Sequence, residues 1–331
     1  TSALTSKEID ELFKIIHQLK DEGIGIIYIS HRLEELQHIV DRVIIMRDGK
    51  YITQMPYDIN RMDEIIANMV GHEIKEKFPR VSCKKGKKIL EVKHLNAGKM
   101  VRDINLELFE GEIVGIAGLM GAGRTETTRA IFGIDPKESG EIFIDGKEVK
   151  INCPADSIKA GLVLAPEDRK KDGLCTRLSI ADNIALPNLD MLCEGPVNRK
   201  KEKEMVDNAV KALKIKLPNA QVDAGSLSGG NQQKVVVAKW LARNSRVVIF
   251  DEPTRGIDVA AKVEIYNLMN QLKQNGIGVM FVSSEMPEVM GMSDRIIVMC
   301  DGRITGEFSA EEATQDMILT KATQFEQKTA S

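Results

Sequence analysis

The sequence lacks several features that would each define a class of protein. It has 46 basic and 49 acidic residues and a net charge of −3, so it carries no positive surplus of the kind that binds nucleic acid. No apolar run approaches the roughly 18–20 residues that span a bilayer, so work at a membrane would need a partner. The five cysteines show neither metal-ligand spacing nor a disulfide pattern, which favours a reducing compartment. The chain opens at Thr1 without a signal-peptide pattern, and an extracellular location is not expected.

An internal repeat organises what is present. Residues 1–50 align without a gap to residues 254–303, and roughly a third of the positions are identical. Phrases such as GIGIIYIS and GIGVMFVS, or DRVIIMRDG and DRIIVMCDG, keep the same apolar pattern. Agreement over that length does not arise by chance.

Each copy of the repeat predicts the same run of helices and strands. An amphipathic helix, over residues 8–20 or 262–273, ends where glycine stops it. The stretch that follows, IGIIYIS (24–30) or IGVMFVS (277–283), is typical of a buried parallel strand. A second helix, a second strand and an Asp-Gly turn complete the copy. Helices that alternate with buried strands indicate a doubly wound α/β fold.

The two copies have different surroundings, which predicts the domain organisation. The second copy follows a long stretch of chain, whereas the first opens the sequence. We expect residues 1–56 to be the C-terminal end of a first domain, residues 57–88 a linker, and residues 89–325 a complete second domain. The linker should contain a helix over 62–70, and its basic stretch KKGKK is interpreted as a solvated connector. The second domain should contain a mostly helical insertion over about residues 152–224.

A glycine-rich turn follows the predicted strand IVGIAGL. Residues 118–125 read GLMGAGRT and fit a phosphate-binding loop, in which backbone N–H groups converge on phosphate oxygens at a helix N-terminus. Arg124 stands where lysine is expected, and its planar fork can hold phosphate but is bulkier than an ammonium group. Thr125 is placed to reach Mg²⁺, whereas Glu126 adds negative charge near the phosphates. The alternative is a glycine-rich turn that binds no nucleotide. The loop glycines are Gly118, Gly121 and Gly123.

Two acids end a second apolar strand. The segment RVVIFDEPTRGID carries Asp251 and Glu252 to the carboxyl end of a buried parallel strand, where α/β domains bind ligands. Asp251 can hold Mg²⁺ through water, and Glu252 can polarise an attacking water. A purely structural pair of acids is the alternative, but unpaired carboxylates resist burial.

A third motif, LSGGNQQ, precedes the apolar helix KVVVAKWLARN. It begins with Leu227, Ser228, Gly229, Gly230, Asn231 and Gln232. With the phosphate loop and the strand-end acids, it makes the chain resemble the ATP-binding cassette (ABC) proteins, whose signature Leu-Ser-Gly-Gly-Gln is matched except at Asn231. The resemblance implies a P-loop NTPase fold, with a RecA-like parallel sheet, an antiparallel β portion and a helical subdomain, and it implies ATP and Mg²⁺ as cofactors. In this family the signature contacts ATP held by the opposite cassette, and Ser228 with the helix N-terminus offers donors to a γ-phosphate.

The resemblance also assigns roles that an isolated residue would not suggest. The family places a histidine after the strand of each copy, in contact with the γ-phosphate and the attacking water; His31 matches it and Ser284 departs from it. Outside the repeat, His31 would be interpreted as a surface residue. Glu167 stands where the family has a glutamine that couples the cassette to its membrane partner. The aromatic residue on which the family stacks adenine is missing between Leu95 and Arg102.

The most specific resemblance is to duplicated-cassette subunits of bacterial monosaccharide importers. It rests on GIAGLMGAGRTE, SLSGGNQQKV, DEPTRGIDV and SSEMPEV, while IIANMVGHEIKEKFP and TKATQF are most similar to the galactose/methyl-galactoside branch, over ribose or xylose. It implies a chain that has lost its N-terminal portion, head-to-tail packing of two cassettes, and catalysis by His31 and Glu252. Hydrolysis is expected at a composite site made with the first cassette, and the site with Arg124 and Ser284 should turn ATP over poorly.

Partners and location follow from the same resemblance. Integral membrane permease subunits and a periplasmic or lipid-anchored sugar-binding protein would complete the importer, on the cytoplasmic face of the membrane and without nucleic acid. The charged run NRKKEKE, in the region that faces the permease in this family, is interpreted as a solvated face. The alternative is a soluble twin-cassette ATPase that binds ribosomes; such proteins carry long charged connectors and intact motifs in both halves, which this chain does not.

Overall fold

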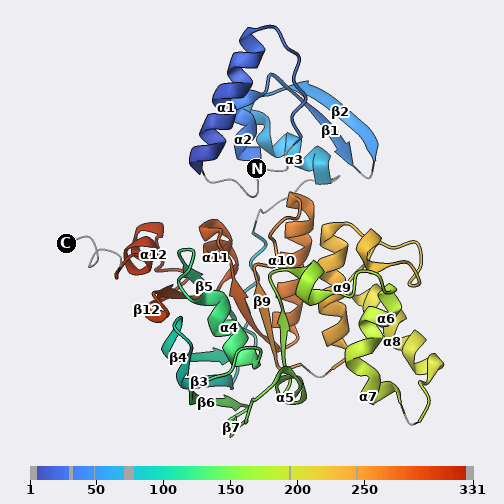
Figure 1. Cartoon of the computed structure of the whole chain (residues 1–331), viewed down its shortest axis with the longest axis vertical. Helices are drawn as coiled ribbons and strands as arrows, with labels where there is room; N and C mark the ends of the chain where they lie inside the picture. The colour runs from blue at the N-terminus through green and yellow to red at the C-terminus, as the bar shows by residue number, and fades with distance from the viewer. Residues whose placement is uncertain are drawn as a thin grey trace. The chain divides into compact units, whose positions relative to one another are not determined.

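The computed structural model describes residues 6–29, 33–47, 49–70, 78–193, 195–243 and 245–325. The chain divides into two compact units (Figure 1). Unit 1 comprises Thr1–Lys77 and Gly256–Val263, and unit 2 comprises Phe78–Arg255 and Glu264–Ser331. Within the described ranges, no helix combines the length and apolar character that crossing a bilayer requires.

Unit 1 contains helices and a two-stranded hairpin. Its elements are α1 (Ser6–Asp21), α2 (Leu33–Ile39), β1 (Arg42–Arg47), β2 (Lys50–Pro56), the short 3-10 helix η1 (Ile59–Arg61) and α3 (Met62–Val70). A small core of Ile45, Met55 and Ile65 joins the hairpin to α3. The helices predicted over residues 8–20 and 62–70 are confirmed.

The first strand predicted for unit 1 is wrong for the residues described. Residues 24–29 form no strand, and the side chains of Ile27 and Ile29 are almost fully exposed. In the described part of this unit, β1 and β2 pair with each other and with no further strand. A buried parallel strand needs hydrogen-bonded neighbours at its edges and apolar layers on its faces, and the described residues of unit 1 supply neither to this stretch.

The centre of unit 2 is a six-stranded sheet in the order β12-β11-β5-β10-β9-β8. The strands are β5 (Ile113–Gly118), β8 (Leu162–Ala165), β9 (Val247–Asp251), β10 (Gly278–Val282), β11 (Arg295–Cys300) and β12 (Arg303–Ser309). All neighbours run parallel except the hairpin of β11 and β12. All residues of β9 and β10 are buried, as their continuous apolar runs predict. The carboxyl ends of the neighbouring strands β5, β10 and β9 therefore meet at one edge of the sheet.

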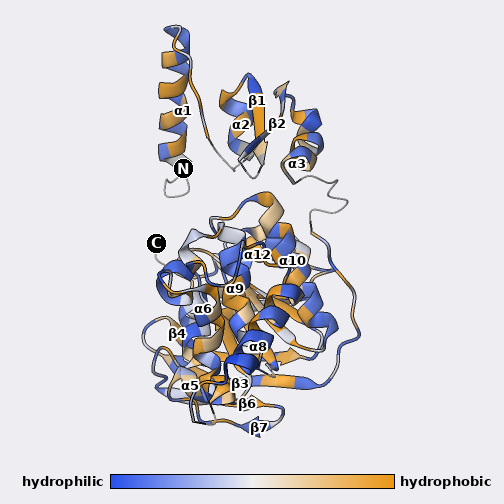
Figure 2. Cartoon of the chain, turned by 90° about the vertical axis from the view of Figure 1, so that its right-hand side faces the viewer, coloured by the Kyte–Doolittle hydropathy of each residue, from blue (hydrophilic) through white to orange (hydrophobic). Residues whose placement is uncertain are grey.

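An antiparallel sheet packs with α4 (Arg124–Phe132) and the parallel sheet around one apolar core. Its order is β4-β3-β6-β7, formed by β3 (Lys88–Ala97), β4 (Val101–Phe109), β6 (Ser139–Ile144) and β7 (Lys147–Glu148). The shared core includes Leu95, Ile104, Ile131, Ile142, Ile249 and Met280. Figure 2 shows hydrophobic residues gathered on the inner strands and hydrophilic ones on outer helices such as α8.

The helices of unit 2 follow the sheet strands in the sequence. The α-helices are α5 (Pro154–Lys159), α6 (Ile180–Ala185), α7 (Leu189–Leu192), α8 (Arg199–Ala212), α9 (Gly229–Leu241), α10 (Val259–Gln274), α11 (Met286–Met292) and α12 (Gln315–Ala322). Short helical turns add η2 (Arg169–Gly173), η3 (Leu186–Asn188) and η4 (Ala224–Ser226). In Figure 1, α6 to α9 gather on one side of the sheet. The first residues of α10 belong to the segment Gly256–Val263, which is part of unit 1.

The helical prediction for residues 152–224 needs a correction. Strand β8 lies inside that range and joins the parallel sheet beside β9. Its four residues, LVLA, are too few to show a period, and their pairing with β9 decides their structure. The rest of the range is mainly helical, and the amphipathic stretch that contains NRKKEKE forms α8.

Candidate functional site

The phosphate loop connects β5 to α4 at the carboxyl edge of the sheet. β5 ends at Gly118 and α4 begins at Arg124. Gly121 and Gly123 have φ angles of 77° and 93°, which glycine adopts without strain. A Cβ on Gly123 would lie 2.2 Å from the carbonyl oxygen of Met100, so any side chain there would clash. The start of such a helix leaves backbone N–H groups available to an anion.

Arg124 ties the phosphate loop to the ends of two strands. Its Nη1 donates to the carbonyl oxygen of Ser283 at 2.6 Å, and its Nη2 lies 3.7 Å from Glu252 Oε1. Both partners lie at strand ends, because Glu252 follows β9 and Ser283 follows β10. The planar guanidinium group of Arg124 contacts two acceptors in a fixed geometry, whereas the ammonium group of a lysine would hold them less rigidly.

Asp251, the last residue of β9, lies beside the first turns of α4. Thr125 Oγ1 donates to Asp251 Oδ1 at 3.2 Å, and Thr128 Oγ1 lies 3.5 Å from Oδ2. Asp251 is 2% exposed, and this burial raises the pKa of its carboxyl to about 6. A buried carboxylate of this kind would be stabilised by a cation.

The oxygens of Thr125 and Asp251 fit a magnesium ion held together with a nucleotide. Mg²⁺ prefers oxygen ligands and commonly uses one or two protein groups plus phosphates and waters. No group of three or more His, Cys, Asp or Glu residues that could hold a metal occurs in the described ranges. The hydroxyl of Thr125 and the carboxylate of Asp251 suit a Mg²⁺ site that phosphate oxygens and waters complete.

Glu252 is held in a strained backbone conformation next to Ser284. Its φ is 46°, a region that side-chain-bearing residues rarely adopt unless their surroundings fix them. Its N–H donates to the carbonyl of Val282 at 3.0 Å, and Ser284 Oγ donates to Glu252 Oε2 at 3.0 Å. Burial raises the pKa of Glu252, and the hydrogen bonds from Ser284 oppose that rise. Ser284 thus lies beside the acid that we expect to polarise water.

The LSGGNQ motif forms the N-terminal end of α9. Ser228 is the exposed N-cap residue, and Asn231 Nδ2 donates to its Oγ at 3.0 Å. Gln232 is buried, and its Nε2 donates to the carbonyls of Leu227 at 3.0 Å and Gly225 at 3.3 Å. These bonds fix the turn that leads into the helix. The described hydrogen bonds of the motif run to neighbouring loops and not to the phosphate loop.

Arg169 is a connecting residue that sequence reasoning missed. Its Nη1 donates to the carbonyl of Arg255 at 3.0 Å, and its Nε lies 3.3 Å from Gln232 Oε1. It therefore links the turn after the strand-end acids to the signature helix. Nearby, Glu167 forms an ion pair with Arg255. No motif marks Arg169, because one of its acceptors is a backbone carbonyl, which any residue type provides.

The predicted site residues divide into three groups. One group meets at the edge of the parallel sheet and comprises Gly118, Gly121, Gly123, Arg124, Thr125, Asp251, Glu252 and Ser284. Glu126 is beside it in the first turn of α4. The second group is the signature. Glu167 is connected to it by an ion pair with Arg255, whose carbonyl accepts a hydrogen bond from Arg169, which in turn contacts Gln232. His31 lies outside the described residues, so its role stays a prediction.

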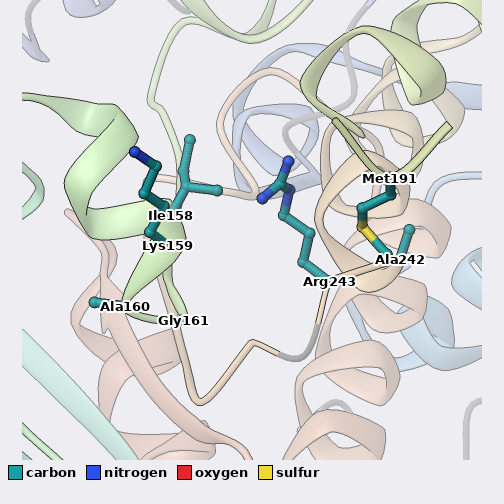
Figure 3. A pocket seen from close by; sticks show the side chains of 7 residues that line it. All are labelled: Ile158, Lys159, Ala160, Gly161, Met191, Ala242 and Arg243. Carbon is teal, nitrogen blue, oxygen red and sulfur yellow. The ribbon is translucent and has the colours of Figure 1, made fainter. Parts of the chain in front are cut away.

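Two open cavities lie in unit 2. One, of about 280 Å³, borders the phosphate loop and the last helix and is lined by Leu119, Met120, Gly121, Ala122, Cys300, Asp301, Ala322 and Phe325. The other, of about 300 Å³, is lined by Ile158, Lys159, Ala160, Gly161, Met191, Ala242 and Arg243 (Figure 3). Because Gly161 precedes β8, this second cavity lies at the amino end of that strand, away from the phosphate loop.

The fold and this arrangement of residues define a P-loop ATPase domain of the ABC type. A family model described as ABC transporter matches residues 101–255. A solved ATP-binding cassette of an ABC transporter superposes with a TM-score of 0.62 at 19% identity, over 72% of this chain and 98% of that one. The dimeric structure of a bacterial ABC transporter cassette gives 0.57 at 24% identity, over 67% and 99%. Residues 101–255 therefore belong to the ABC transporter ATPase domains, with the predicted combination of parallel and antiparallel sheets.

Curated proteins similar to this chain are named as import ATP-binding proteins for sugars. The ribose import ATP-binding protein RbsA of Bacillus subtilis is 49% identical over 324 residues, which cover 98% of this chain and 66% of that protein. The ribose import ATP-binding protein RbsA 1 of Rubrobacter xylanophilus is 46% identical over 98% of this chain and 65% of that protein. An import ATP-binding protein of Albidiferax ferrireducens, whose name gives ribose, galactose and methyl galactoside together, is 47% identical with the same coverage. The chain thus spans 65–66% of the length of these relatives.

Proposed function

We propose that unit 2 binds MgATP at the edge of its parallel sheet, as part of an ATP-binding subunit that energises monosaccharide import. The convergence of Thr125, Asp251, Arg124 and Glu252 carries the proposal, because it joins the phosphate loop to the two strand-end acids. The loop N–H groups and Arg124 would hold phosphates, and Thr125 with Asp251 would hold Mg²⁺. The ion would offset the charge of the phosphates and of the buried Asp251 carboxylate.

We further propose that the chain contains the end of one cassette and the whole of another. Residues 1–56 would end the first cassette, residues 57–88 would connect, and residues 89–325 would form the second. The repeat supports this division, as do the exposed Ile26, Ile27 and Ile29, whose counterparts in unit 2, Val279, Met280 and Val282, are buried. A first cassette complete with its own phosphate loop would cover them.

The two nucleotide sites of such a pair would differ. In the site of unit 2, Ser284 stands in place of the family histidine, and Arg124 is engaged by Ser283 and Glu252. We propose that this site binds nucleotide and hydrolyses it slowly. The exposed signature at Ser228 would face ATP held by the first cassette, with His31 alongside, and that composite site would hydrolyse it.

We also propose partners and a class of sugar for this ATP-binding subunit. Permease subunits and a sugar-binding protein would complete the importer at the cytoplasmic face of the membrane. The relatives are named for ribose, or for ribose, galactose and methyl galactoside together, and so favour a monosaccharide without supporting the galactose branch alone. We assign sugar selection to the partner subunits.

Equilibrium binding of a fluorescent ATP analogue, with Mg²⁺ and with EDTA, tests the nucleotide site. We expect saturable binding by the whole chain, and a loss of about tenfold or more in the magnesium-dependent part for Asp251→Asn. Asp316→Asn, an exchange of the same kind in the exposed first turn of α12, is the matched control and should leave binding unchanged. Absence of binding by the unaltered chain, or equal binding by both variants with Mg²⁺, would contradict the proposal.

A further inference from the structure

A buried carboxylate with no role assigned so far lies next to the strand ends, in the SSEMPEV segment. Glu288, in α11, is 1% exposed. It accepts hydrogen bonds from Thr254 Oγ1 at 2.7 Å, from Tyr266 Oη at 2.6 Å and from Ser283 Oγ at 2.8 Å. The donors come from the turn after β9, from α10 and from the end of β10. One side chain therefore joins three elements of unit 2.

These hydrogen bonds make the carboxylate tolerable in the interior. A buried charge is costly unless hydrogen bonds replace its lost hydration, and three hydroxyl donors do so here. Burial first, and then the negative charge of Glu288, raise the pKa of Tyr266, so that its hydroxyl stays protonated and able to donate. Removal of the acceptor would leave buried hydroxyls without their partner, which costs more than the bond itself contributes.

The cluster is continuous with the proposed nucleotide site through Ser283. The carbonyl of Ser283 accepts the hydrogen bond from Arg124, and its Oγ accepts one from the N–H of Glu285 at 3.0 Å. The next residue, Ser284, donates to Glu252. A displacement of Ser283 would therefore change the surroundings of both Arg124 and Glu252.

The internal repeat provides independent support for this carboxylate. Glu35 is the counterpart of Glu288 in the first copy; it is 6% exposed and accepts a hydrogen bond from Tyr28 Oη at 2.8 Å. The two tyrosines do not occupy equivalent positions. Tyr28 corresponds to Phe281, and Tyr266 corresponds to Phe13. Tyrosine and phenylalanine have thus changed places between the copies, and each glutamate keeps one tyrosine hydroxyl.

We propose that Glu288 is a positioning residue for the nucleotide site of unit 2. It holds Ser283 and Thr254 in place, and through them it fixes Ser284 beside Glu252 and the carbonyl that binds Arg124. The proposal rests on the nucleotide site put forward above and adds a residue that lies outside the phosphate loop, the strand-end acids and the signature.

Glu288→Gln tests the proposal, with Glu112→Gln as the matched control. Glu112 is also buried, at 4% exposure, and it pairs with Arg295 near the amino end of β5, far along the strand from the phosphate loop. We expect Glu288→Gln to weaken binding of the fluorescent ATP analogue by about tenfold, whereas Glu112→Gln changes it less than about twofold. Amide hydrogen exchange at residues 283–285 should accelerate in Glu288→Gln and not in Glu112→Gln.

Substitutions at the tyrosine positions keep the test informative if Glu288→Gln does not fold. Tyr266→Phe should accelerate amide hydrogen exchange at residues 283–285. Adding Phe281→Tyr should restore slow amide exchange, because the pair then has the arrangement of Phe13 and Tyr28. Restoration is an effect that simple loss of packing would not produce.

The outcomes separate this proposal from the one on which it rests. If the unaltered chain binds no nucleotide, the proposed function fails, and the exchange measurements still decide whether Glu288 positions residues 283–285. If the chain binds nucleotide while Glu288→Gln and Glu112→Gln behave alike in both binding and exchange, the role of Glu288 is overturned and the nucleotide site stands. A double variant that exchanges no more slowly than Tyr266→Phe would likewise overturn it.

Discussion

The two copies of the repeat share an apolar pattern and differ in how they bury it. In the second copy, Met280 and Val282 are 0% and 1% exposed within β10, while the matching Ile27 and Ile29 of the first copy are 92% and 93% exposed. The helices that precede these stretches, α10 and α1, form in both copies. A helix satisfies its own backbone, whereas a parallel strand depends on neighbours such as β5 and β9. The same apolar pattern therefore forms a strand only where neighbouring strands supply hydrogen-bond partners.

The largest expected difference in stability between the two copies comes from placing a lysine at corresponding positions of the repeat. Met280→Lys should destabilise unit 2 by about 4 kcal/mol or more, because it buries an unpaired ammonium in the centre of the sheet. Ile27→Lys, at the exposed counterpart, should change stability by no more than about 0.5 kcal/mol. Urea unfolding followed by circular dichroism measures both, and the fluorescence of the single tryptophan, Trp240, reports on unit 2 alone. Equal losses would show that residues 24–29 are buried after all.

An ion pair that occurs in both copies gives the next contrast. Lys273 and Asp294 are 2.7 Å apart with the lysine 1% exposed, whereas Lys20 and Asp41 are 2.6 Å apart with side chains 42% and 76% exposed. Lys273 also donates to the carbonyl of Val81 at 2.6 Å. Lys273→Met should cost about 2–3 kcal/mol, because it removes the buried ammonium and its hydrogen bonds to Asp294 and to the carbonyl of Val81, and Lys20→Met about 0.5 kcal/mol or less.

Thermal unfolding of the two variants measures this difference. A loss for Lys20→Met as large as that for Lys273→Met would contradict the exposure of the first pair. Such a result would mean that the first copy is packed as tightly as the second.

The smallest expected effect concerns pH and is specific to the acid that ends β9. Burial raises the pKa of Asp251 from 3.8 in the unfolded chain to about 6, so the folded state holds a proton that the unfolded state has released. The free energy of unfolding should therefore fall as pH rises from about 4 to 6. Above that range Asp251 is ionised in both states, and the cost of its buried charge no longer changes with pH. Asp251→Asn should thus stabilise unit 2 by about 1–2 kcal/mol at pH 7.5 and by little at pH 4.

Unfolding midpoints at both pH values, with Asp316→Asn as control, check this prediction. A variant that is less stable than the parent at pH 7.5 would mean that Asp251 is held by favourable interactions in its charged form. Because Asp251→Asn should also weaken MgATP binding, the variant would gain stability and lose function at one residue.

Much of unit 2 could be predicted from the sequence because its motifs and its apolar runs agree. The loop from Gly118 to Thr125 and the acids at the end of β9 lie on the elements that their patterns predict. Strand β8 was missed because four residues show no period and its pairing with β9 is a contact between distant parts of the chain.

Contacts to backbone atoms and between distant side chains were also beyond sequence reasoning. Arg124 was noted as a departure from lysine, but its bond to the carbonyl of Ser283 has no signature in the sequence. The Glu288 cluster draws its donors from three elements, and only the structure brings them together. In unit 1, the error at residues 24–29 arose because a local pattern was interpreted without its neighbours.

Hydrogen exchange of the whole chain, with and without MgATP, tests the burial of the two repeat copies and the nucleotide site together, because one sample reports on both copies. We predict slow exchange at residues 278–282 and fast exchange at residues 24–29, with MgATP giving added protection at residues 118–125 and 283–285. Equal protection of the two matched stretches would contradict their different burial, and no response of the phosphate loop to MgATP would contradict the nucleotide site.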